Sequence, residues 1–122
     1  MVSIVLKYTW ILHFLVTIFF GVALFVVPDV FFGSMGWPVE IAMDRSFGSM
    51  FIALAIISLL AFREESFDRV EILVILEILL TLLGLVASLW NMLTMTLPVV
   101  GWAFTGLYAL FFILFLYSYM TK

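Results

Sequence analysis

Two side chains that can gain or lose a proton stand inside long apolar stretches, and a threonine follows each of them four residues later. The two pairs are His13 with Thr17 and Glu77 with Thr81. A spacing of four residues places both side chains of a pair on one face of a helix. An imidazole and a carboxylic acid held in this way could exchange a proton or anchor a polar ligand. These four residues are our first candidate site, a binding or proton site.

His13 and Glu77 lie at similar depths in their apolar stretches. His13 is nine residues past Ile4 and Glu77 is seven residues past Val70, which is about 13 Å and about 10 Å along a helix. Ionisable groups this deep in a membrane usually face other helices or an internal cavity. We therefore expect His13 and Glu77 to face each other or a shared cavity. Two interpretations stay open: a structural hydrogen bond that fixes helix register, and a site for protons or a polar ligand.

A second candidate site lies around Arg45, near the opposite end of the apolar stretches. Arg45 follows Asp44, and Asn91 stands near the end of the third apolar stretch. If the guanidinium turns inward toward Asn91, these three residues form an outer polar site for an anionic group. In the alternative, the long arginine side chain extends to the membrane surface and pairs with Asp29, Glu40 or Asp44.

Composition excludes several kinds of chemistry. The chain has no cysteine, which rules out disulfides, thiolate metal ligands and thiol redox reactions. Its single histidine cannot supply two haem ligands, and no zinc motif or glycine-rich phosphate loop occurs. No basic run indicates nucleic acid. We predict no catalytic residue, no metal site and no cofactor, and we favour a non-enzymatic protein.

The elements that must position these residues are four long apolar stretches, at residues 4–27, 41–62, 70–93 and 97–120. Hydrophobic residues make up 67% of the chain and charged residues 11%, against roughly 45–50% and about 25% in soluble domains. About 20 apolar residues suffice for a helix to cross a membrane. We therefore predict an all-α fold with a single transmembrane domain, residues 1–122. It should be an integral membrane four-helix bundle with up-down-up-down topology.

Basic residues give this bundle an orientation. With four spans, the N-terminus, the middle turn and the C-terminus lie on the same side of the membrane. That side holds Lys7, Arg63, Arg69 and Lys122. The other side holds only Arg45. Because cytoplasmic segments carry an excess of Lys and Arg, we predict a multi-pass protein of the cell membrane. Its N- and C-termini should both be cytoplasmic.

The segment 28–38 joins the first two stretches on the outer side. It is too apolar for a solvated loop, since it contains Phe31, Phe32, Met35 and Trp37. We expect a helical turn that lies on the outer membrane surface, with these side chains in lipid. Pro38 suits the first turn of the helix that follows.

Small and polar residues recur at steps of three or four in each stretch. In membranes such faces are where helices meet, because small residues allow close approach and hydroxyls bond across. The sets are Thr9, His13, Thr17 and Gly21; Ala42, Ser46, Ser49 and Ala53; Glu77, Thr81, Gly84, Ser88 and Asn91; and Gly101, Thr105 and Ala109. We expect these faces to form the helix contacts.

Residues 20–63 carry a pattern of their own: a helix that ends in Pro28, a short aromatic loop, and a second helix that begins near Arg45 and ends near Arg63. The loop contains Phe32, Gly36 and Trp37, and the second helix opens with Arg45, Ser46, Phe47 and Gly48. This pattern resembles the small four-helix membrane proteins of bacteria and archaea in the broad DoxX-like group. The resemblance implies an accessory or lipid-phase binding role and transfers no catalytic residue.

Two functional hypotheses follow. The first is an accessory or interaction subunit, or a binder of a lipid or hydrophobic molecule. The second is a small proton-coupled carrier that uses Glu77 and His13. It would work as an oligomer, because four short helices rarely enclose a pathway. A third, an enzyme that acts on a lipid through the same pair, lacks a recognisable motif. The expected partners are membrane lipid, further copies of the chain or a larger membrane complex, and no nucleic acid.

Overall fold

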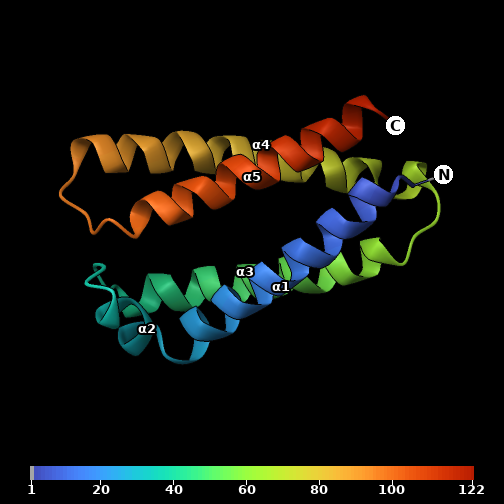
Figure 1. Cartoon of the computed structure of the whole chain (residues 1–122). Helices are drawn as coiled ribbons and strands as arrows, with labels where there is room; N and C mark the ends of the chain where they lie inside the picture. The colour runs from blue at the N-terminus through green and yellow to red at the C-terminus, as the bar shows by residue number, and fades with distance from the viewer. Residues whose placement is uncertain (1) are drawn as a thin grey trace. The chain divides into compact units, whose positions relative to one another are not determined.

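The computed structural model describes residues 2–122, and its regular structure is helical (Figure 1). The helices are α1 (Ile4–Val26), α2 (Pro28–Ser34), α3 (Ile41–Phe62), α4 (Phe67–Thr94) and α5 (Gly101–Met120). All of them except the short α2 are long and apolar enough to cross a membrane. The predicted all-α class is therefore confirmed, and each long helix overlaps one of the predicted apolar stretches.

The helix ends differ from the apolar stretches mainly at the starts of α4 and α5. The first turn of α4 begins at Phe67, directly after Ser66 in an extended conformation. At the start of α5, Pro98 accepts a hydrogen bond from the Gly101 amide in a preceding turn. The expected place of Pro38 in the first turn of α3 is wrong, because α3 begins three residues later, at Ile41. Polar turn residues thus join α4, and proline stays outside both α3 and α5.

Two compact units make up the chain. One contains Trp10–Leu60, and the other combines Ala61–Lys122 with the N-terminal residues up to Thr9. The first unit holds most of α1, all of α2 and most of α3. The second unit holds α4, α5 and the beginning of α1.

In the first unit, α1 and α3 pack side by side in opposite directions (Figure 1). His13 contacts Ser58 toward one end of the pair, and Gly21 lies against Ile52 further along. A Cβ atom added to Gly48 would lie 2.6 Å from the Phe25 nitrogen. The two backbones therefore meet closely through glycine, as is common between membrane helices.

The face that α3 uses is not the one that we predicted. Ala42, Ser46, Ser49 and Ala53 are all exposed. The buried face of α3 instead contains Asp44, Gly48, Ala55 and Ser58. The predicted face of α1 is correct, because Thr9, His13, Thr17 and Gly21 are all buried.

In the second unit, α4 and α5 form an antiparallel pair. The hydroxyls of Ser88 and Thr105 are within hydrogen-bond distance, and Gly84 lies against the ring of Tyr108. At the opposite end, Lys122 binds Glu71 at 3.1 Å. Residues toward the end of α4 thus contact the first half of α5, and Glu71 near the start of α4 contacts the residue beyond the end of α5. The two helices are therefore paired over most of their length.

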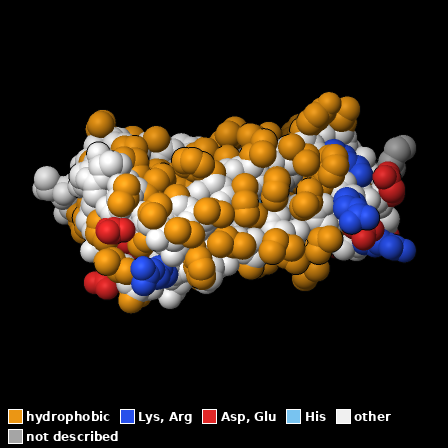
Figure 2. Space-filling view, turned by 90° about the horizontal axis from the view of Figure 1, so that it is seen from below, with side chains coloured by type: hydrophobic (Ala, Val, Ile, Leu, Met, Phe, Trp, Pro, Cys, Tyr) orange, Lys and Arg blue, Asp and Glu red, His pale blue; other side chains and the backbone are white. Residues whose placement is uncertain are grey.

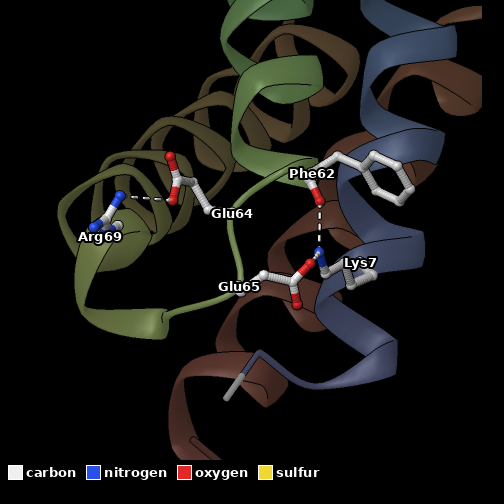
Figure 3. Close-up of polar contacts among 5 residues, drawn as sticks. All are labelled: Lys7, Phe62, Glu64, Glu65 and Arg69. Atoms are coloured by element: carbon white, nitrogen blue, oxygen red, sulfur yellow. Dashed lines mark hydrogen bonds and ion pairs between the residues drawn. The ribbon is translucent and has the colours of Figure 1, made fainter.

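Charged side chains gather at one end of this second unit (Figure 3). The Lys7 ammonium donates to the Phe62 carbonyl at 2.8 Å, and it lies 3.5 Å from the Glu65 carboxylate. Arg69, in the first turn of α4, lies 3.6 Å from the Glu64 carboxylate. A cation at the C-terminus of a helix, here α3, is favoured by the helix dipole. Lys7 thus joins the start of α1 to the turn between α3 and α4.

The C-terminus ends in the same unit, beside the start of α4. The hydrogen bond to Glu71 raises the pKa of the Lys122 amine above its usual range. The Lys122 ammonium also lies 4.2 Å from the centre of the Tyr119 ring. Both contacts favour the charged form of the Lys122 amine.

The short helix α2 is closed by a glycine motif. Gly36 has a positive φ of 71°. The Trp37 amide donates to the Phe32 carbonyl and the Gly36 amide donates to the Gly33 carbonyl. The rings of Phe32 and Trp37 lie 6.0 Å apart. These two bonds and the ring contact are those of a Schellman helix end, so the glycine sets the path of the chain out of α2.

Gly36→Ala should open this helix end. An L residue in the left-handed region costs roughly 1–2 kcal/mol, and 1.4 kcal/mol is about a tenfold change in an equilibrium. We expect hydrogen exchange of the Trp37 amide to speed up about tenfold, measured by NMR or mass spectrometry. Gly33→Ala is the matched control, because nothing lies within 4 Å of an added Cβ there. Equal exchange in the two variants would contradict this role of Gly36.

Large apolar side chains are exposed on all four long helices, from Ile4 to Met120. On the face shown in Figure 2, apolar side chains cover the middle, and Lys, Arg, Asp and Glu side chains gather toward the two ends. Apolar patches of this extent on a protein mark contact with lipid or with another protein.

Candidate functional site

His13 is held inside the first unit by Ser58, a polar side chain that is not among the candidate residues predicted from the sequence. Its Nδ1 atom lies 2.7 Å from the hydroxyl oxygen of Ser58, and that hydroxyl donates to the Leu54 carbonyl at 2.7 Å. His13 is 5% exposed and Ser58 is fully buried. The Trp10 ring meets the imidazole edge-on, at 6.4 Å between centroids. The imidazole is therefore fixed in position by neighbours from both α1 and α3.

Glu77 is buried in the second unit, on α4, and is only 3% exposed. Because α4 begins at Phe67, Glu77 is ten residues into its helix, which is about 15 Å. His13 is nine residues into α1, or about 13 Å. The longer α4 thus leaves both ionisable groups at comparable distances from the beginnings of their helices. Such groups in membrane spans mark functional sites or internal pairs.

Thr17 and Thr81 play the same local role in the two helices. The Thr17 hydroxyl donates to the His13 carbonyl at 2.6 Å, and the Thr81 hydroxyl donates to the Glu77 carbonyl at 2.6 Å. Both threonines are buried. Each hydroxyl proton is therefore bonded to a backbone carbonyl. Toward a ligand or a neighbouring side chain, each threonine can act only as a hydrogen-bond acceptor.

The pairing of His13 with Glu77 stays a prediction. His13 belongs to the unit Trp10–Leu60, and Glu77 belongs to the unit that contains Ala61–Lys122. Each of the two residues is buried, and each shares its helix face with a buried threonine, as the sequence predicted.

The three residues of the predicted outer site have different surroundings. Arg45 and Asn91 are exposed, whereas Asp44 is buried. The Asp44 carboxylate accepts a hydrogen bond from the Glu40 amide at 3.1 Å, just before the first turn of α3. A carboxylate at a helix N-terminus satisfies a backbone donor and is favoured by the helix dipole. Asp44 therefore caps α3, and an anion site formed by Arg45 with Asn91 stays a prediction.

A signal for Ser58 was present in the sequence. Asp44, Gly48, Ala55 and Ser58 follow one another at steps of four, seven and three residues. These steps keep them on one helix face. That face competed with the set containing Ser46 and Ser49, which recurs without a gap at steps of four, three and four residues and has more hydroxyls. Within residues 2–122, no group of three or more His, Asp or Glu side chains is arranged to hold a metal ion.

Comparisons of the chain with protein-family models, curated proteins and solved structures find no match. The function must therefore be inferred from the chain's own residues.

Proposed function

We propose that this is a four-span protein of the cell membrane that acts without catalysis. It would serve as an accessory subunit of a larger membrane assembly, or as a binder of a lipid or hydrophobic molecule. The supporting observation is its exposed apolar surface: only 17% to 33% of the most apolar part of each long helix is buried. Lipid, a hydrophobic ligand or partner helices must cover the remainder.

The contacts at the charged end of the second unit support an arrangement with both termini in the cytoplasm. Val2 donates its amide to the Glu65 carbonyl at 3.1 Å, and Lys122 binds Glu71 at the start of α4. The N-terminus, the turn before α4 and the C-terminus therefore share one end of this unit, as an even number of crossings requires. Lys7, Arg69 and Lys122 lie there, and basic residues favour the cytoplasmic side.

A proton-coupled carrier is the second candidate. One observation favours it: His13 and Glu77 are both buried within membrane-length helices, at 5% and 3% exposure. Retaining an ionisable group there is costly, and such groups often belong to proton relays. In this proposal the protein works as a homo-oligomer, and Glu77 and His13 alternate in holding the transported proton.

Native mass spectrometry of the full chain, released from membranes in mild detergent, separates these proposals. The accessory and binding roles predict a stable complex with a different membrane protein, or a bound lipid or hydrophobic molecule that survives detergent exchange. The carrier predicts a homo-oligomer. A bare monomer at every detergent concentration would contradict all of these roles.

The aromatic segment of α2 gives a test of the membrane boundary. Phe31 packs against Phe19 and Phe20 at 5.8 and 5.7 Å between ring centroids, and Trp37 is half-buried. In a variant that keeps only Trp37, we expect its fluorescence to be quenched by brominated lipids, because amphipathic rings lie at the membrane surface. Quenching by aqueous iodide alone would show that this segment lies in water.

A further inference from the structure

The two contacts of the Ser58 hydroxyl decide which nitrogen of His13 carries a proton. A serine hydroxyl has one proton to donate. The Ser58 oxygen lies 2.7 Å from both the Leu54 carbonyl and the His13 Nδ1 atom. Both contacts are hydrogen bonds only if the hydroxyl donates to the carbonyl while Nδ1–H donates to the hydroxyl oxygen.

The opposite arrangement is costly. If Ser58 donated to His13 instead, its oxygen and the Leu54 carbonyl would face each other at 2.7 Å without a proton between them. Ser58 is fully buried, so water could not relieve that repulsion. The Leu54 carbonyl would keep its helical hydrogen bond from the Ser58 amide within α3, but the two oxygen atoms would repel each other at this short distance.

We infer that Ser58 is a positioning residue that holds neutral His13 as the Nδ1–H tautomer and leaves Nε2 as its proton-accepting atom. The hydrogen bond of one ring nitrogen sets the state of the other. Neutral histidine in water prefers the opposite tautomer, with the proton on Nε2, so Ser58 reverses the ordinary preference. Nδ1–H donates to Ser58 in both the neutral and the charged ring. A proton can therefore enter and leave at Nε2 while the contact with α3 stays intact.

The functional meaning of this arrangement rests on the proton-carrier proposal, because an accessory subunit would need no defined proton-accepting atom. The tautomer itself does not depend on that proposal. Proton flux in vesicles tests the carrier and NMR tests the tautomer, so failure of one is distinguishable from failure of the other.

The experiment is nitrogen NMR on the full chain in lipid bilayers, labelled with ¹⁵N-histidine and purified without a histidine tag. The chain has one histidine, so every imidazole signal belongs to His13. At a pH where the spectrum shows a neutral ring, we expect a one-bond N–H coupling on Nδ1 and none on Nε2. A neutral ring protonated on Nε2, or a mixture of the two tautomers, would overturn the inference.

Ser58→Ala should shift the coupling to Nε2 or divide it between the two nitrogens. Ser118→Ala is the matched control, because Ser118 is also buried and donates to the Leu114 carbonyl at 2.8 Å. It should leave the His13 spectrum unchanged. Ser58→Thr keeps the hydroxyl and should keep the proton on Nδ1, and it serves if the alanine variant does not fold. The inference would also be overturned if folded Ser58→Ala kept the proton on Nδ1, or if folded Ser58→Thr no longer kept it there.

Discussion

Gly48→Ala should lower the free energy of unfolding by about 1–3 kcal/mol, the usual cost of forcing an extra carbon into a well-packed interior. The new Cβ would lie 2.6 Å from the Phe25 nitrogen and 2.8 Å from the Gly21 oxygen. Both are backbone atoms, which cannot rotate away as a side chain can. The helices α1 and α3 would have to separate, and the contact between His13 and Ser58 would weaken with them.

The matched control for this variant is Gly106→Ala. Nothing lies within 4 Å of a Cβ at Gly106 in α5, and alanine in a helix is favoured over glycine by roughly 0.5–1 kcal/mol. Gly84→Ala should fall between the two, because its new carbon meets the side chain of Tyr108 and not backbone. Unfolding in mixed micelles with increasing SDS measures all three. If Gly48→Ala were as stable as Gly106→Ala, the close contact of α1 with α3 would be wrong.

Glu77 should show the largest functional effect. If the carrier proposal is correct, Glu77→Gln should abolish the proton flux that a pH gradient drives into vesicles containing the purified protein. The amide keeps the shape and hydrogen-bonding capacity of the side chain but cannot exchange a proton. Folding should therefore be preserved. Glu65→Gln is the control, because its carboxylate is exposed beside Lys7. Flux that persists in Glu77→Gln at the wild-type rate would exclude a proton-carrying role for this residue.

The predicted pairing of Glu77 with His13 has a separate readout. In a double-mutant cycle, Glu77→Leu and His13→Leu should be coupled by about 0.6 kcal/mol, and by up to about 1.7 kcal/mol, as found for hydrogen bonds between membrane helices. Stability is again measured by unfolding in mixed micelles. Additive effects of the two substitutions would show that the side chains do not interact.

Hydrophobicity predicted the helices well because it acts on whole segments. Each long helix of the structure overlaps one apolar stretch, and the aromatic segment after Val27 contains the helix α2, as expected. Pro28 lies in the first turn of that helix, where the missing N–H costs nothing. These features depend on the composition and local chemistry of short segments, which a sequence displays directly.

The contact face of α3 could not be predicted in the same way. Ser46 and Ser49 resemble the hydroxyls of a helix interface, but they donate to the carbonyls of Ala42 and Ser46 in their own helix. A serine satisfied by its own backbone can remain on an exposed face of a membrane helix. Hydroxyl spacing alone therefore does not identify the packed side.

The partner of His13 depends on the register between two helices. That register is set by the close approach of Gly48 to Gly21 and its neighbours on α1, which places Ser58 opposite His13. The burial of His13 and Glu77 could be predicted, because a charge within an apolar helix must be sheltered from lipid. Which atom shelters it is decided by packing between segments that are far apart in the sequence.

Cysteine labelling tests the central claim, a four-span protein with cytoplasmic ends, most directly. The chain has no cysteine, so the variants Ser66→Cys, Thr121→Cys and Ser34→Cys each carry a single thiol. A membrane-impermeant maleimide added to intact cells should label Ser34→Cys alone, and it should label the other two only after the membrane is opened. Labelling of Ser66→Cys in intact cells would contradict the predicted topology and the account built on it.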